Sequence, residues 1–157
     1  MIRLIMIPAI LILVTGLAAP SAAAVHTAPF NGHMSGSSVA ISEVSNDIKA
    51  TIFLEHLGKS QLVGTTTVNG QSACGGFTGT EKDTITAANG DKIFLSGHGV
   101  SCPTTPTIFH DTVTFTINGG TGRFAEASGS GTTQTTITIT SQTTASFTAT
   151  ITGTINR

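Results

Sequence analysis

The sequence predicts an all-β protein whose strands close into an eight-stranded antiparallel up-and-down barrel. Threonine, a β-branched residue that fits a pleated surface, occurs 28 times in residues 25–157. Apolar residues recur there at every second position, as in Phe147, Ala149 and Ile151, and no segment has helical spacing. Turn residues divide the chain into eight strands without crossover helices. Closure into a barrel removes the unpaired edges of such a sheet.

The N-terminus has the pattern of a secretory signal peptide. A short basic head precedes an almost entirely apolar run at residues 4–19, and small residues follow, so we expect cleavage after Ala24. A membrane anchor fits less well, because this run is short for a spanning helix and contains Pro8 and Gly16. We therefore expect a secreted or periplasmic protein that has no membrane partner after cleavage. The expected divisions are the signal peptide (1–24), a loose N-terminal segment (25–35) and one barrel domain (36–157).

Turn signals place the eight strands. The clearest hairpin is "TITAANGDKIFL", because Asn89-Gly90 reverses the chain with left-handed backbone geometry at low cost. A three-residue loop at 88–90 keeps the apolar residues of both strands on one face and turns His98 outward. A two-residue loop would instead place His98 beside Glu81, so we favour the first register. The strands are predicted at 36–43, 49–56, 60–69, 76–87, 91–100, 107–117, 127–141 and 144–155.

The sequence contains two cysteines, Cys74 and Cys102. An even number of cysteines in an exported chain favours a disulfide. The predicted hairpin pairs residue 102 near position 76 or 77, which brings both cysteines to the same end of the barrel. The alternative is a zinc site formed with His98 and His110, but no C-x-x-C pair supports it. We expect the disulfide, and neither a metal nor a cofactor.

Composition argues against several classes of partner. Residues 25–157 carry six Lys or Arg and eight Asp or Glu, a net charge of −2, with no basic cluster. We therefore expect no nucleic-acid partner, because phosphate binding needs concentrated positive charge. The chain has no Trp and no Tyr, the usual platforms for stacking bases or sugars. Motifs typical of serine hydrolases and zinc proteases are also missing from the sequence.

The glycine-rich segment "NGGTGRFAEASGSG" (118–131) raises the question of a phosphate-binding loop. Gly120, Gly122 and Ala125 fit the G-x-G-x-x-G/A pattern of dinucleotide folds, and a predicted strand precedes them. That site also needs a following helix, a βαβ unit and an acidic residue about 20 positions later. The remaining chain is threonine-alternating strand, so the interpretation fails. The glycines instead predict a barrel corner with Phe124 as a plug.

The same segment, "INGGTGRFAEASGSG", resembles the G-G-T-G-x-F-x-x-A-x-G segment of plant dirigent proteins and the related "GGSGIFEG" segment of allene oxide cyclases. The segments "EHLGK" (55–59) and "AANGD" (87–91) are similar to segments of bacterial relatives. The resemblance implies a calycin-like barrel with an apolar lumen, and assembly as a homo-oligomer, a trimer in this superfamily. Dirigent proteins guide the coupling of phenolic radicals, and the cyclases close an epoxide into a ring. Both activities depend on holding a reactive small molecule in a dry cavity.

Strand parity suggests candidate site residues. Asp111 shares a strand face with Phe109 and Phe115, and Glu81 and Asp83 share a face with apolar neighbours. If these faces line the lumen, burial shifts the carboxyl pKa values and suits them to acid or base chemistry. Alternatively, these strand ends reach solvent at the rim, or a bulge reverses the parity. The candidate catalytic pair is Asp111 and Arg123, with Glu81, Asp83, Phe109 and Phe115 as candidate ligand-binding residues.

Arg123 has two possible positions at the corner. It either lines the barrel mouth, where its charge would stabilise an oxyanion, or pairs with Glu126.

Two classes of function remain open. The first is a barrel that holds a small apolar ligand, with cyclase or isomerase-like activity as a further possibility. The second is a non-catalytic extracytoplasmic protein with a structural or interaction role, whose barrel is filled by its own side chains. A lumen pocket of about 300 Å³ or more, lined by Phe and Ile, favours the first class. A packed lumen favours the second.

Overall fold

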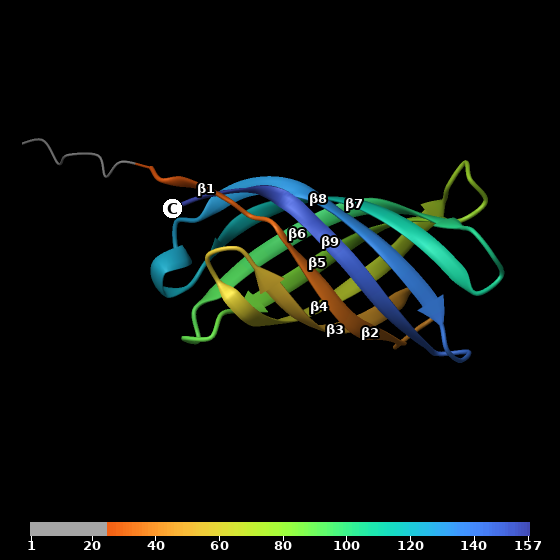
Figure 1. Ribbon diagram of the computed structural model, residues 1–157. Helices are drawn as coiled ribbons and strands as arrows, with labels where there is room; N and C mark the ends of the chain where they lie inside the picture. The colour runs from red at the N-terminus through yellow and green to blue at the C-terminus, as the bar shows by residue number, and fades with distance from the viewer. Residues whose placement is uncertain (1–24) are drawn as a thin grey trace, which may run out of the picture.

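The computed structural model describes residues 25–157, and the predicted signal peptide and its cleavage site lie outside them. Eight antiparallel strands form a closed barrel with one short additional strand (Figure 1), which confirms the predicted fold class. Within the described residues, no helix has the length and apolar character needed to cross a membrane. The strands are β1 (Thr27–Pro29), β2 (Gly32–Ala40), β3 (Ser45–Leu54), β4 (Gly58–Gln71), β5 (Phe77–Thr86), β6 (Lys92–Pro103), β7 (Ile108–Gly120), β8 (Ser128–Ile139) and β9 (Thr144–Asn156).

Pairing between the last and second strands closes the barrel. Successive strands from β2 to β9 pair with one another, and β9 also pairs with β2. The short β1 extends this ladder along β9, where Thr27 pairs with Asn156, and Phe30 between β1 and β2 is buried. The segment 25–35, expected to be loose, therefore contains β1 and the start of β2. Pro29, Asn31 and Gly32 have weak strand propensity, and the segment is ordered by the pairing that β9 supplies.

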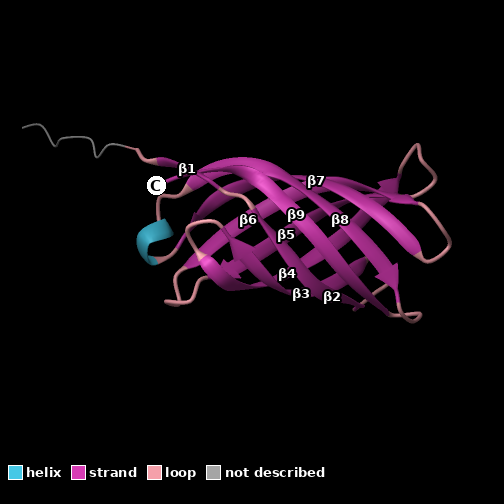
Figure 2. Ribbon diagram, in the orientation of Figure 1, coloured by secondary structure: helices cyan, strands magenta, loops and turns pink. Residues whose placement is uncertain are grey.

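The two ends of the barrel differ in how they are filled. At one end, a single 3₁₀ turn, η1 (Gly122–Phe124), follows β7 (Figure 2), and Phe124 is completely buried there as a plug. We call this the closed end. Its packed core includes Phe30, Ile52, Ile85, Ile93 and Phe115, each with at most 2% of its surface exposed. Most threonines of the strands lie on the outer face, as the period-two pattern predicts.

The hairpin between β5 and β6 has the register favoured by the sequence. Ile85 pairs with Ile93, and the chain reverses through three residues between Ala87 and Asp91. Ile85, Ile93 and Leu95 are buried together, while His98 points outward. This register fixes which side chains of β5 and β6 enter the lumen.

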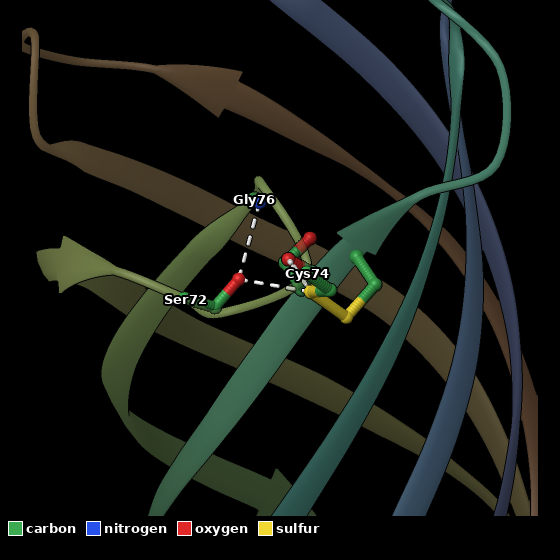
Figure 3. The surroundings of a disulfide bond; sticks show 5 residues. Ser72, Cys74 and Gly76 are labelled. Carbon is green, nitrogen blue, oxygen red and sulfur yellow. Dashed lines mark hydrogen bonds between the residues drawn. A yellow bond between two sulfur atoms is a disulfide. The ribbon is translucent and has the colours of Figure 1, made fainter.

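The predicted disulfide joins Cys74 to Cys102, with 5.7 Å between the Cα atoms. Phe77 pairs with Ser101, so the cysteines lie at the same barrel end, as predicted. Figure 3 shows the turn that carries Cys74, in which the Ser72 hydroxyl accepts a hydrogen bond of 3.1 Å from the Gly76 amide. The thiolates that a zinc site would need are consumed in this bond. We call this end of the barrel the mouth.

Candidate functional site

The lumen is hollow in the half that adjoins the mouth. A cavity of about 330 Å³ opens there, and we call it the mouth cavity. A second cavity of about 100 Å³, the inner cavity, lies deeper and is bounded by core residues such as Ile85, Leu95 and Phe115. The residues that line both cavities are Thr66, Glu81, Asp111, Val113 and Ile137. The two cavities therefore share a boundary that includes two carboxyl groups.

Apolar and small side chains form most of the mouth cavity. Its apolar lining includes Val68, Phe77, Val100, Phe109, Ile137 and Ile139. The disulfide fixes part of this wall, because Cys74 precedes Phe77 and Cys102 follows Ser101, and both of these partners line the cavity. The opening is thus held by a covalent link as well as by strand pairing. The volume of the mouth cavity and its Phe and Ile lining meet the criterion of a lumen pocket of about 300 Å³ or more.

Three carboxyl groups enter the lumen from two strands. Glu81 and Asp83 lie two residues apart on β5, so their side chains share one face, and Asp111 projects from β7. Glu81 and Asp111 line both cavities, and Asp83 lines the inner one. Strand parity therefore placed all three side chains on the lumen face correctly. The strand pairing is regular around these residues, so no bulge reverses their direction.

Glycines on neighbouring strands provide the space for two of these carboxyl groups. Gly64 pairs directly with Asp83, and a Cβ atom added to Gly64 would overlap Asp83 Oδ1. Gly97 pairs with Glu81, and its added Cβ would lie 3.0 Å from Glu81 Oε1 and 2.8 Å from Val113 Cγ1. Real Cβ atoms almost never come closer than 3.0 Å to such neighbours, so a larger residue at position 64 would displace the Asp83 carboxyl group, and one at position 97 would displace Val113 and crowd Glu81.

Burial dominates the electrostatics of the site. Desolvation, followed by the charge of Asp83, hydrogen bonding with Asp83 and the charge of Asp111, raises the pKa of Glu81 to about 8. Burial raises the pKa of Asp83 to about 6, and hydrogen bonding with Glu81 opposes this rise. Glu81 and Asp83 therefore titrate as a pair in which the proton resides mainly on Glu81.

Asp111 shows the same effect of burial. Its raised pKa comes from desolvation, opposed by the Ser101 hydroxyl and by the positive charge of His110. His110 itself faces outward, where its Nδ1 lies 3.2 Å from the Thr136 hydroxyl oxygen. At neutral pH the lumen therefore combines a protonated carboxylic acid, Glu81, with an ionised carboxylate, Asp83. Such a combination can donate and accept protons.

The structure separates the two residues of the candidate catalytic pair. Arg123 lies on η1 at the closed end, where its Nε is 3.7 Å from Asp91 Oδ2 and its guanidinium lies 4.8 Å from the centre of the Phe124 ring. It lines neither cavity, and its ion-pair partner is Asp91 rather than Glu126. Asp111 lies near the opposite end of β7, about 30 Å of extended strand from the corner. The pairing of Asp111 with Arg123 is therefore wrong, because β7 spans the length of the barrel between them.

The two candidate phenylalanines occupy different depths. Phe109 lines the mouth cavity, whereas Phe115 bounds the inner cavity and is 2% exposed. The Phe115 ring packs against Phe30, with 5.9 Å between the ring centres. Phe109 is thus placed to contact a molecule in the mouth cavity, while Phe115 belongs to the core beneath it.

Sequence reasoning missed several polar residues of the site. Thr66 lines both cavities, Thr135 lines the inner cavity and Glu43 lies at the mouth, in the turn between β2 and β3. Parity could have found Thr66, because it lies on the same β4 face as Leu62 and Val68. Thr135 shares a face with Ile137 in the same way. Glu43 had no such signal, because a turn residue has no alternating pattern.

Comparison of the chain with models of protein families, with curated proteins and with solved structures found no match. Among residues 25–157, no group of three or more His, Cys, Asp or Glu side chains is arranged to hold a metal ion. The site that emerges is an open apolar cavity with carboxyl groups where it meets the inner cavity.

Proposed function

We propose that this protein is an exported barrel that holds a small, mainly apolar molecule in its mouth cavity. The observation that carries the proposal is the mouth cavity itself, about 330 Å³ in volume and open at one end of the barrel. Cavities that bind small molecules are typically concave and mostly apolar, with a few convergent polar groups and volumes of about 300–1,000 Å³. The cavity is within this range, and its polar groups include the carboxyl groups of Glu81 and Asp111.

The contrast between the barrel ends supports a binding role. A barrel that served only as a scaffold could fill its lumen with its own side chains, as the closed end does with Phe115 and Phe124. The mouth half instead presents glycine, alanine and serine to the lumen, including Gly79, Gly99 and Ala145. Small residues on the lumen face leave a hollow that a ligand can occupy.

We further propose that the carboxyl groups support cyclase or isomerase-like chemistry on the bound molecule. Glu81, protonated near neutral pH, would donate its proton to one atom of the ligand, and Asp111 in its ionised form would remove a proton from another. The ligand then changes its bonding without a net gain or loss of protons. Exchange with water at the open mouth returns both carboxyl groups to their starting states.

The resemblance of the Gly119–Gly129 segment to dirigent proteins and allene oxide cyclases supports the same proposal, including assembly as a homo-oligomer. The signal-peptide pattern supports export. The disulfide is compatible with an oxidising compartment, where such bonds form and persist.

Binding of a neutral fluorescent apolar dye such as Nile red tests the proposal. Ser38 on β2 lines the mouth cavity, whereas the neighbouring Ser37 faces outward and is exposed. Ser38→Leu should weaken dye binding at least about tenfold by filling the cavity, and Ser37→Leu should leave it unchanged. Circular dichroism and thermal unfolding check that both variants keep the barrel. Absence of saturable binding to the wild-type protein would overturn the proposal and favour the non-catalytic alternative.

A further inference from the structure

We propose that the ligand of the mouth cavity is a cationic amphiphile, a small apolar molecule that carries an amine. This inference rests on the proposed ligand-holding function and specifies the chemical class of the ligand. The apolar cavity walls would contact its body, and the carboxyl groups between the two cavities would contact its ammonium group.

The charges that line the lumen have one sign. The titratable side chains lining the two cavities are Glu43, Glu81, Asp83 and Asp111, and none of the Lys, Arg or His residues in the described part of the chain lines either cavity. All six Lys and Arg side chains after residue 24 are exposed, and they lie on the outer face, the turns or the C-terminus. A low-dielectric cleft lined by charges of one sign concentrates counter-ions of the opposite sign. This lumen therefore selects for cations and against anions.

Two buried acceptor atoms indicate where an ammonium would bind. Asp83 Oδ1 and Asp111 Oδ1 are buried, and neither accepts a hydrogen bond from any described residue. A buried carboxylate oxygen without a donor is costly, and a donor that also carries positive charge stabilises it most. An ammonium supplies three N–H donors and the positive charge, whereas an alcohol supplies one donor without charge. Asp111 lines both cavities, so an amine held in the mouth cavity can approach it.

The lining of the two cavities is poorly suited to a metal ion as the preferred ligand. A hydrated metal ion needs several oxygen ligands around one point, and the described residues offer no cluster of three acidic or imidazole groups with that geometry. The cavity also presents Phe77, Phe109 and Ile139, which gain nothing from a hydrated ion but bury surface against an apolar body. An organic cation matches both the charge and the walls.

Binding of a cation should be coupled to proton release. Glu81 faces Asp83 on its own strand, Asp111 from β7 and uncharged residues on its pairing partners, Thr66 of β4 and Gly97 of β6. A cation beside these groups favours their ionised forms and displaces the proton that the pair otherwise retains. Affinity for an amine should therefore rise as the pH rises from about 5 towards the pKa of Glu81, about 8. Glu43 at the rim and His110 behind Asp111 are the other charged or titratable neighbours of this cluster.

Three unbranched ten-carbon probes with different head groups test the inference: decylamine, 1-decanol and decanoate. Calorimetry or dye displacement below their micelle-forming concentrations measures binding to the wild-type protein. Decylamine should bind at least about tenfold more tightly than decanol, as expected for hydrogen bonds to charged groups, and decanoate should bind most weakly. Decylamine affinity should increase from about pH 5 to about pH 8, where the amine remains protonated, and decanol affinity should not.

Isosteric variants show which carboxyl groups cause the preference for decylamine. Asp111→Asn and Glu81→Gln should remove most of the preference for decylamine over decanol while leaving decanol binding nearly unchanged. Asp47→Asn is the matched control, because Asp47 is an exposed carboxylate near the mouth that faces outward. If Asp47→Asn loses the preference for decylamine equally, the preference comes from the overall negative charge of the surface. That result would overturn the assignment of the ammonium site to the lumen.

The remaining outcomes separate this inference from the proposed function. If decanol binds as tightly as decylamine, the cationic class is wrong, while the ligand-holding function stands. If none of the three probes binds and Nile red also fails to bind, both are overturned.

Discussion

Asp83 Oδ1 occupies the position that a Cβ atom on Gly64 would take, across the ladder in which β4 and β5 pair these two residues directly. A carboxyl group on a packed β-barrel wall needs space beside it, and the missing side chain of Gly64 provides that space. The backbone oxygen of Lys82 also lies 2.8 Å from the same position. The glycine on one strand therefore permits the carboxylate on the next.

Gly64→Ala should lower the free energy of unfolding by about 1–3 kcal/mol, as expected for overpacking a tight site. Gly70→Ala is the matched control on the same strand, because its added Cβ would meet only the flexible Thr78 hydroxyl, at 2.9 Å. Chemical denaturation measures both variants. Placing Gly64→Ala in an Asp83→Ala background should reduce the cost only in part, since the Lys82 carbonyl remains. Equal costs for Gly64→Ala and Gly70→Ala would contradict this account.

Stability should fall as the pH rises from about 4.5 to about 8, because Glu81 and Asp83 bind protons more tightly in the folded barrel than in the unfolded chain. Their contribution is fully present below the unfolded pKa values, and it is lost as the pH rises through the folded values of about 6 and about 8. The loss should be of the order of 1 kcal/mol per pH unit for each group within its window. Urea denaturation at a series of pH values measures the slope.

Glu81→Gln should flatten this dependence and make the protein more stable than the wild type near pH 8, because the amide never ionises. Glu126→Gln, at an exposed position after η1, serves as the control and should leave the slope unchanged. A wild-type stability that rises across this pH range would show that the lumen carboxyl groups are not protonated by burial.

Arg123→Ala should leave ligand binding unchanged and should alter stability by less than about 1 kcal/mol. The reason is that Arg123 is half exposed, with 47% of its side chain accessible, and its only ion pair among the described residues is the 3.7 Å contact with Asp91 at the closed end. Dye binding and thermal unfolding measure the two effects. A large loss of dye binding in Arg123→Ala would contradict this prediction, because it would mean that a change at the closed end alters the mouth cavity.

The individual strands were predictable because strand signals are local. Period-two alternation located all eight barrel strands, and it correctly placed Asp111 on the same face as Phe115. The Asn89-Gly90 turn fixed the β5–β6 register, and this register aligned Cys102 with the turn that carries Cys74. In each case the information lies within one strand or one hairpin, where backbone geometry leaves few alternatives.

The candidate site could be predicted only in part. Parity places Glu81, Asp83 and Asp111 on apolar faces, but it does not show how far along the barrel each one lies. Arg123 follows Asp111 by twelve positions, and β7 carries it to the far end of the barrel. The strand character of residues 32–35 was also missed, because it depends on pairing with β9, more than a hundred residues later in the chain.

The sequence by itself determined the all-β class, the strand faces, the β5–β6 turn and the cysteine pairing, because these follow from side-chain alternation, turn chemistry and a single pair of thiols. Only the tertiary structure decided that the closed end is packed and the mouth end is hollow. That difference depends on the summed volumes of side chains that eight strands contribute to each level of the lumen. Residues such as Gly64, Glu81 and Ala145 come from distant parts of the chain, and only closure of the barrel brings their volumes and charges together.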